Sequence, residues 1–171
     1  MIAFKCLHVG GIAPFSRLAW PLPQGRASGA WVEAEPNACA SGIHACRADD
    51  LPYWLTDHLW TIELDEVQAT EHKLVARRGR LLEQIHAWDD AAMRDFAADC
   101  AARAEAILAR DESLAGYVED ARTSARAGNA PVTGFIVARV AELADGIDAY
   151  DTERAAQARW LVDRLSLDVG P

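Results

Sequence analysis

The chain has 171 residues, of which 51% are hydrophobic and 25% charged, a composition typical of globular proteins and not of disordered or fibrous ones. Its 17 basic and 26 acidic residues give a formal net charge of -9, so the overall field repels nucleic-acid backbones and anionic lipid, and we expect neither bulk nucleic acid nor a membrane as a partner. No segment approaches the roughly 20 apolar residues of a membrane span, and the chain does not open with a basic and apolar leader, so we expect a cytoplasmic protein.

The composition changes sharply after residue 88. All five histidines, both lysines and five of the six tryptophans lie in residues 1–88, whereas residues 89–171 hold 21 of the 34 alanines and no histidine. We therefore expect two structural units: a β-rich unit at 1–88 that contains the histidines, most cysteines and a ligand-binding site, and an alanine-rich, acidic helical unit at 89–171.

The first unit is expected to form short strands, because its apolar and aromatic runs are separated by turn residues. Asp49 or Asp50 would cap one short helix. Arg78 and Gly79 would form a tight hairpin turn. In chain order the expected elements are strands at 2–8, 17–20, 29–35 and 43–46, the helix at 51–55, a strand at 58–64, and strands at 73–76 and 80–86 on either side of the hairpin turn.

The second unit is expected to form about four helices, because its apolar residues recur at helical spacing. Asp89 and Asp90 would be the cap and first-turn acid of a helix that runs to Leu108. Further helices are expected at 114–127, at 132–144 and from 151 or 152 to about 165. The third would have its apolar face at Phe135, Ile136, Val140 and Leu143.

These elements predict an α+β fold, in which a small, twisted, mostly antiparallel sheet with one short helix packs against a C-terminal bundle of about four helices. One face of the helical unit could instead join two copies into a homodimer, but packing against the chain's own strands is the favoured expectation.

Two pairs of Cys and His residues suggest a place for chemistry. Alternation along a strand puts Cys6 and His8 on one face, opposite Lys5 and Leu7, and likewise puts His44 and Cys46 together. If the two strands were neighbours, the two imidazoles and two thiols would form a donor set that zinc accepts, although neither pair has the spacing of familiar zinc modules. A nucleophilic cysteine beside a histidine is the next hypothesis, and inert buried thiols are the simplest alternative.

A resemblance to a known fold rests on the same segment. The run Gly42-Ile43-His44-Ala45-Cys46 is followed by a helix containing Tyr53-Trp54 and then by a strand at 59–64. This order resembles the central motif of ADP-ribosyltransferase-fold proteins, especially the poly(ADP-ribose) polymerase branch, with histidine in place of the usual tyrosine. The pattern C-x-x-G-I-H-A-C, which starts at Cys39, is also similar to a group of uncharacterised bacterial and phage domains.

The resemblance covers residues 4 to 86 and implies NAD or a related nucleotide as the ligand. It implies that His8 and Gly10 hold the nicotinamide carboxamide, that His44 stacks on the nicotinamide ring, and that Glu83 is the catalytic acid. Tyr53 and Trp54 would complete the nucleotide site. The protein would then be an ADP-ribosyltransferase-like protein, either active or catalytically silent.

Other functions stay open beside this one. The first is a non-catalytic module that binds a small molecule or a protein partner, with the tryptophans of the first unit either lining a ligand pocket or forming the core. The second is a zinc-dependent function on Cys6, His8, His44 and Cys46.

Overall fold

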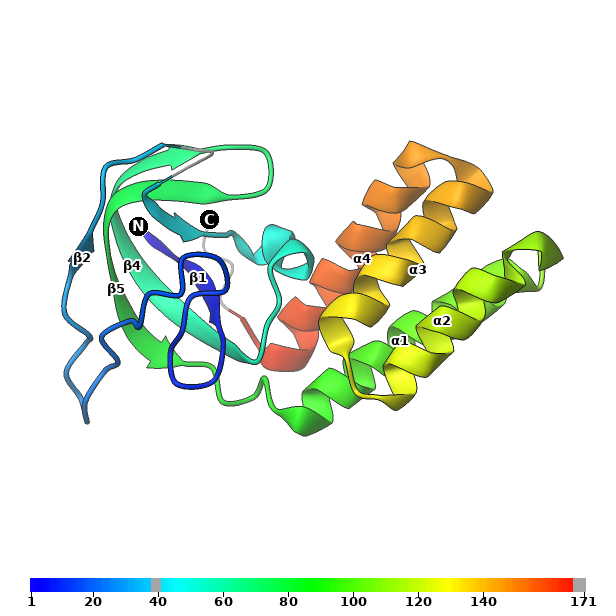
Figure 1. The fold of residues 1–171 in the computed structure, drawn as a ribbon, viewed down its shortest axis with the longest axis horizontal. Helices are drawn as coiled ribbons and strands as arrows, with labels where there is room; N and C mark the ends of the chain where they lie inside the picture. Colours follow the sequence, from blue (N-terminus) through cyan, green and yellow to red (C-terminus); the bar gives the residue numbers. More distant parts are fainter. Residues whose placement is uncertain (38–40, 168–171) are drawn as a thin grey trace. The chain divides into compact units, whose positions relative to one another are not determined.

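The computed structural model describes residues 1–37 and 41–167, and it divides into two compact units, one ending at Ala87 and the other beginning at Trp88 (Figure 1). The fold is α+β, as expected, with an antiparallel sheet of five strands in the first unit and the long helices in the second. Cys39, the first cysteine of the C-x-x-G-I-H-A-C pattern, lies outside the described residues.

The sheet is built around one long hairpin. Its two strands, β4 (His58–Ala69) and β5 (Leu74–Gln84), pair antiparallel along most of their length. Strand β1 (Ile2–Leu7) pairs with the first half of β4, while β3 (Ile43–Ala45) and the two-residue β2 (Val32–Glu33) pair with β5. All of these pairings are antiparallel, so the prediction of a mostly antiparallel sheet is confirmed.

The sheet curls until its two sides meet. Directly after β3, Cys46 forms an antiparallel bridge with Phe4 of β1, and the two backbone N–H···O bonds of this bridge are each 2.9 Å long. The strands β1, β4, β5 and β3 thereby form a closed ring. The first strand and the segment after Gly42 therefore lie side by side at this bridge, as the zinc hypothesis required.

The prediction of a hairpin turn at Arg78 and Gly79 is wrong, because both residues lie within β5. The chain turns instead between Thr70 and Lys73, where the Thr70 amide donates to the Lys73 carbonyl oxygen at 2.8 Å. Gly79 serves close packing: a Cβ there would lie 2.7 Å from Cγ2 of Ile43, across the inside of the ring. A glycine inside a strand often marks such a close approach.

Two further expectations for the first unit are corrected. Residues 17–20 form no strand; Ala19 makes only an isolated bridge with Ile12, within the loop that follows β1. The short helix is a 3-10 helix, η1 (Ala48–Tyr53), and it begins earlier than expected. Its N-cap residue is Arg47, so the expected cap at Asp49 or Asp50 is wrong; both acids lie in the first turn instead.

The inside of the ring forms the core of the first unit. Ala3 and Leu7 of β1 point inward and pack against Ile43, Ala45 and Ile62. Lys5 lies between Ala3 and Leu7 on the same face of the strand, so its side chain also points inward. A lysine at this position is the exception in an otherwise apolar interior.

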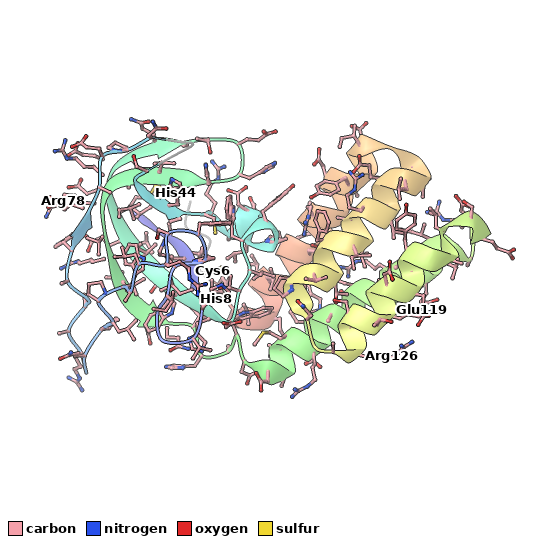
Figure 2. All side chains as sticks on the ribbon, in the orientation of Figure 1. Cys6, His8, His44, Arg78, Glu119 and Arg126 are labelled. Atoms are coloured by element: carbon pink, nitrogen blue, oxygen red, sulfur yellow. The ribbon has the colours of Figure 1, made fainter. Side chains whose placement is uncertain are left out.

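The second unit contains α1 (Asp90–Leu108), a short 3-10 turn η2 (Glu112–Leu114), α2 (Ala115–Arg126), α3 (Ala130–Asp145) and α4 (Ile147–Leu165). Asp89 caps α1, as expected, by accepting a hydrogen bond from the Ala92 amide at 2.8 Å. Helix α4 begins earlier than expected, directly after Gly146, whose φ of +91° makes the turn. Exposed ion pairs such as Arg126–Glu119, at 3.0 Å, lie along α2 (Figure 2).

The apolar face of α3 differs from the expected one. Phe135 and Leu143 are 51% and 47% exposed, whereas Val137 and Val140 are fully buried. The apolar run at 135–137 allows two neighbouring stripes, and the small Thr133 and Gly134 turn the other stripe inward because Gly134 packs closely against Phe96 of α1. A homodimer through the helical unit stays a prediction. No helix among the described residues is long and apolar enough to span a membrane.

Candidate functional site

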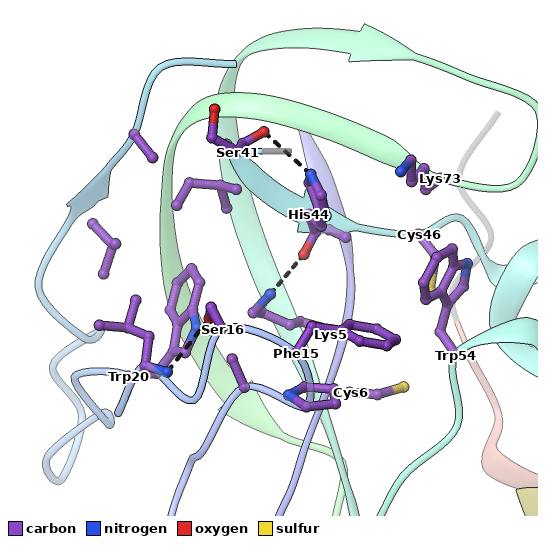
Figure 3. A pocket seen from close by; sticks show the side chains of 18 of the residues that line it. Lys5, Cys6, Phe15, Ser16, Trp20, Ser41, His44, Cys46, Trp54 and Lys73 are labelled. Carbon is purple, nitrogen blue, oxygen red and sulfur yellow. Dashed lines mark hydrogen bonds between the residues drawn. The ribbon is translucent and has the colours of Figure 1, made fainter. Parts of the chain in front are cut away.

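The first unit contains a cavity of about 650 Å³. Its lining residues come from β1 and the loop after it, from the β2 and β3 segments, and from Trp54 and Lys73 (Figure 3). Aliphatic and aromatic side chains make up much of its wall, and polar or ionisable side chains lie among them. The aromatic lining residues are Phe4, Phe15, Trp20 and Trp54, and those with polar or ionisable side chains are Lys5, Cys6, Ser16, Glu33, Ser41, His44, Cys46 and Lys73.

Lys5 is the most unusual residue of the cavity, because it is charged and only 8% exposed. Its Nζ donates a hydrogen bond of 2.6 Å to the backbone carbonyl oxygen of His44, and it lies 4.5 Å from the centre of a Trp20 ring. Among the residues that the structure describes, no carboxylate forms an ion pair with this ammonium group. A carbonyl oxygen and an aromatic face are therefore its stabilising contacts.

Burial changes the acidity of the groups around Lys5 in opposite directions. Desolvation lowers the pKa of Lys5 to about 8, although the neighbouring thiols of Cys6 and Cys46 act against this shift. The same desolvation raises the pKa of Cys6 to about 12 and that of Cys46 well above its usual value. Because burial disfavours the charged form of each group, the amine becomes a better nucleophile near neutral pH while the thiols stay protonated.

His44 contributes a neutral imidazole to the same wall. Burial is the main cause that lowers its pKa, and the charge of Lys73 adds to it. The Nε2 atom lies 3.2 Å from the carbonyl oxygen of Ser41, so the neutral ring carries its hydrogen on Nε2 and leaves Nδ1 as an acceptor.

The two tryptophans of the cavity are held by backbone groups. Trp54 follows the 3-10 helix, and its indole Nε1 donates to the carbonyl oxygen of His72 in the β4–β5 turn at 2.6 Å. The Trp20 amide donates to the Gly11 carbonyl oxygen at 3.0 Å, which fixes the loop after β1. Phe15 of that loop approaches Trp54 edge to face, with ring centroids 6.3 Å apart. Two of the tryptophans thus line a pocket, while Trp60 and Trp88 lie in cores.

The structure brings together only part of the residue set that the sequence indicated. His44 and Trp54 line the cavity, but His8, Gly10, Tyr53 and Glu83 are not among its lining residues. His8 lies beyond the end of β1, with its Nδ1 3.0 Å from Oδ2 of Asp57, whereas His44 lies on β3 (Figure 2). The two imidazoles therefore do not share one hollow, and the expectation that they do is wrong.

The remaining predicted residues serve other contacts. Gly10 lies in the turn after β1 with a φ of +79°. Tyr53 stacks on the His72 ring with centroids 4.1 Å apart. Glu83 is exposed on β5, where its backbone carbonyl oxygen accepts a hydrogen bond from the Thr61 hydroxyl at 3.2 Å.

The predicted zinc site is also corrected. In residues 1–37 and 41–167, no three His, Cys, Asp or Glu side chains are grouped so that they could hold a metal ion. Cys6, His8, His44 and Cys46 are all described, so they do not form the tetrahedral set. The position of His8 is one reason: it is held by Asp57 beyond the end of β1 and does not line the cavity that Cys6, His44 and Cys46 line.

Lys5 is the site residue that the sequence analysis missed. The signal was present in Ala3-Phe4-Lys5-Cys6-Leu7, where strict alternation puts Lys5 on the same face as two small or apolar residues. A charged residue on the inward face of a buried strand indicates either a buried partner or a functional group. The comparison with known proteins adds no residue to this set: no family model, no curated protein and no solved structure matches the chain.

Proposed function

We propose that the first unit binds a small organic molecule in the cavity beside Lys5. The observation that carries this proposal is a cavity of about 650 Å³ that contains a buried ammonium group with no carboxylate partner among the described residues. Cavities of this size hold molecules of a few dozen atoms, and a mainly apolar wall with a few polar groups is typical of such sites.

The wall indicates the chemistry of the ligand. Trp20 and Trp54 offer flat apolar surfaces, which favours a ligand with a flat or aromatic body. Lys5 offers a positive charge that is already desolvated, which favours a polar or anionic head group on that body. The proposed ligand is therefore a small, flat molecule with one polar end.

The test is a ligand screen by thermal unfolding. Aromatic acids, aldehydes, alcohols and nucleotides are added one at a time, and a ligand that binds raises the melting temperature. A ligand at 100 times its dissociation constant adds roughly 2.7 kcal/mol to the free energy of unfolding. Trp54→Ala should abolish the shift, whereas Trp31→Ala, a matched change outside the cavity, should keep it. If no compound shifts the melting temperature, or if Trp31→Ala removes the shift as well, the proposal fails.

NAD is a specific member of this screen. Two residues that the resemblance assigns to a nicotinamide site, His44 and Trp54, line the cavity, which supports a nicotinamide nucleotide as one candidate ligand. Incubation with labelled NAD would show transfer of the label or release of nicotinamide. Absence of binding at millimolar NAD rejects this candidate and leaves the wider proposal to the other ligands.

A further inference from the structure

We propose that Lys5 forms a reversible imine with an aldehyde or ketone held in the cavity. The inference rests on the proposed function, because it requires that the cavity accept a small molecule. It goes further by naming the ligand class as carbonyl compounds and by making the attachment covalent.

The geometry around Lys5 suits the product of this step. The Lys5 amine lies in the cavity wall and is fixed by one backbone acceptor, the carbonyl oxygen of His44 at 2.6 Å (Figure 3). A protonated imine keeps one N–H on the same nitrogen, so this carbonyl oxygen can accept its hydrogen bond as it accepts that of the ammonium. The Trp20 ring, 4.5 Å away, stabilises a positive charge on that nitrogen in both forms.

The step balances without any oxidant or reductant. The Lys5 ammonium first gives a proton to water, and the neutral amine adds to the carbonyl carbon to form a carbinolamine. Loss of one water molecule then gives the imine, which takes up one proton to become the iminium ion. Addition of water reverses each stage and releases the carbonyl compound.

The neighbouring nucleophiles do not compete with Lys5. Burial holds the pKa of Cys6 at about 12 and that of Cys46 well above its usual value, so both thiols are protonated near neutral pH. The pKa of Lys5 is about 8, against 10.5 for an unperturbed lysine, so its neutral fraction at pH 7 is larger by roughly two orders of magnitude. The amine is therefore the group of the inner wall that attacks a carbonyl carbon.

The experiment uses benzaldehyde as the probe and cyanoborohydride to reduce the imine to a stable amine. The chain has only two lysines, Lys5 and Lys73, so peptide mass spectrometry resolves labelling at both and at the Met1 amine. We expect Lys5 in the folded protein to react at least about tenfold faster at pH 7 than Lys5 in the urea-unfolded protein, with a half-maximal rate near pH 8.

The controls separate this proposal from the previous one. Benzyl alcohol, which has no carbonyl group, should bind reversibly and slow the labelling of Lys5. Lys5→Arg and Lys5→Met should both lose the label at position 5 while Met1 is still labelled. The control needs only one of these two variants to fold. If benzyl alcohol binds but Lys5 is labelled no faster than in urea, the imine is excluded and small-molecule binding stands. If neither compound binds and Lys5 is not labelled, both proposals fail.

Discussion

The two units of the molecule stabilise a cation in different ways, one of them half-buried and the other buried. In the second unit, Arg103 of α1 donates to both carboxylate oxygens of Glu153 on α4, with N–O distances of 2.9–3.1 Å, and it also pairs with Asp99. In the first unit, Lys5 is as deeply buried as Glu153 but meets a carbonyl oxygen and an indole ring. One cation is neutralised by opposite charge, and the other is not.

The difference has a chemical meaning. The carboxylates beside Arg103 raise its pKa despite partial burial, so its charge is permanent and serves to join α1 to α4. Burial without a counter-ion lowers the pKa of Lys5, so its charge can be lost near physiological pH. A cation held by carboxylates is a structural group, whereas one held by neutral acceptors can exchange its proton and react.

The largest expected effect is on the alkylation rate of the buried thiols, one in each unit. Burial raises the pKa of Cys6 and of Cys100 to about 12, against 9.0 for a free thiol. The thiolate fraction at pH 8 is then roughly a thousandfold lower than in an unfolded chain, and alkylation by iodoacetamide should slow by a similar factor. Peptide mapping of the alkylated cysteines measures the ratio of the rates in folded and urea-unfolded protein. Rapid alkylation of folded Cys6 would contradict the view that Lys5 is the nucleophile of the cavity.

The second prediction is the pH dependence of stability that Lys5 causes. Its folded pKa of about 8 lies below the unfolded value of 10.5, so between these values the unfolded chain binds more protons and stability rises with pH. The cost of burying the ammonium is full below pH 8 and disappears above pH 10.5. In Lys5→Met this contribution is absent, so urea denaturation of both proteins should show a difference that changes by about 3 kcal/mol across this range. A difference that does not vary with pH would mean that Lys5 is not buried as a charged group.

The paired cation gives the third prediction. Glu153→Gln keeps the size of the side chain but removes the charge opposite Arg103, and it should lower the free energy of unfolding by about 2 to 3 kcal/mol. Glu119 is the control, because it also pairs with arginines but on the exposed side of α2, so Glu119→Gln should have a much smaller effect in the same urea titration. Equal losses of stability in the two variants would contradict the structural role of the Arg103–Glu153 pair.

The smallest effects concern the space around glycines in the two units. A Cβ on Gly79 would lie 2.7 Å from Ile43 and 3.2 Å from Ile62 and Leu64, so Gly79→Ala should cost about 2 kcal/mol in the tight ring. Gly116 in α2 has open space around its Cα, and Gly116→Ala should add about 0.5 kcal/mol through helix propensity. Melting temperatures should therefore move in opposite directions, and a tolerated Gly79→Ala would show that the ring is looser than its geometry indicates.

Much of the fold follows from local signals in the sequence. The Asp89 cap, the long helices and the strands near residues 2–8 and 58–64 each depend on periodicity or capping within one segment. The local pattern at Arg78 and Gly79 predicted a turn that does not exist. Gly79 is needed there because a larger side chain would collide with Ile43 across the ring. Pairing between distant segments decides its role, and no local pattern carries that information.

The site was predicted only in part for the same reason. The segment around His44, which the sequence pattern singled out, does line the cavity. On β1, Cys6 lines the cavity but His8 does not, and the neighbouring Lys5 is the residue with the unusual environment. Histidine and cysteine are common in active sites, and the prediction was based on them. Lys5 is a common residue type, and only its position on a buried strand is unusual.

Closure of the strand ring at Phe4 and Cys46 also decides which part of the molecule a ligand can protect. His44, whose carbonyl oxygen holds Lys5, lies two residues before this bridge, so opening the ring dismantles the cavity. A bound molecule therefore adds its free energy to the closed ring and opposes its opening. Hydrogen exchange of the Phe4 and Cys46 amides, which form the bridge, should therefore slow as the ligand concentration rises.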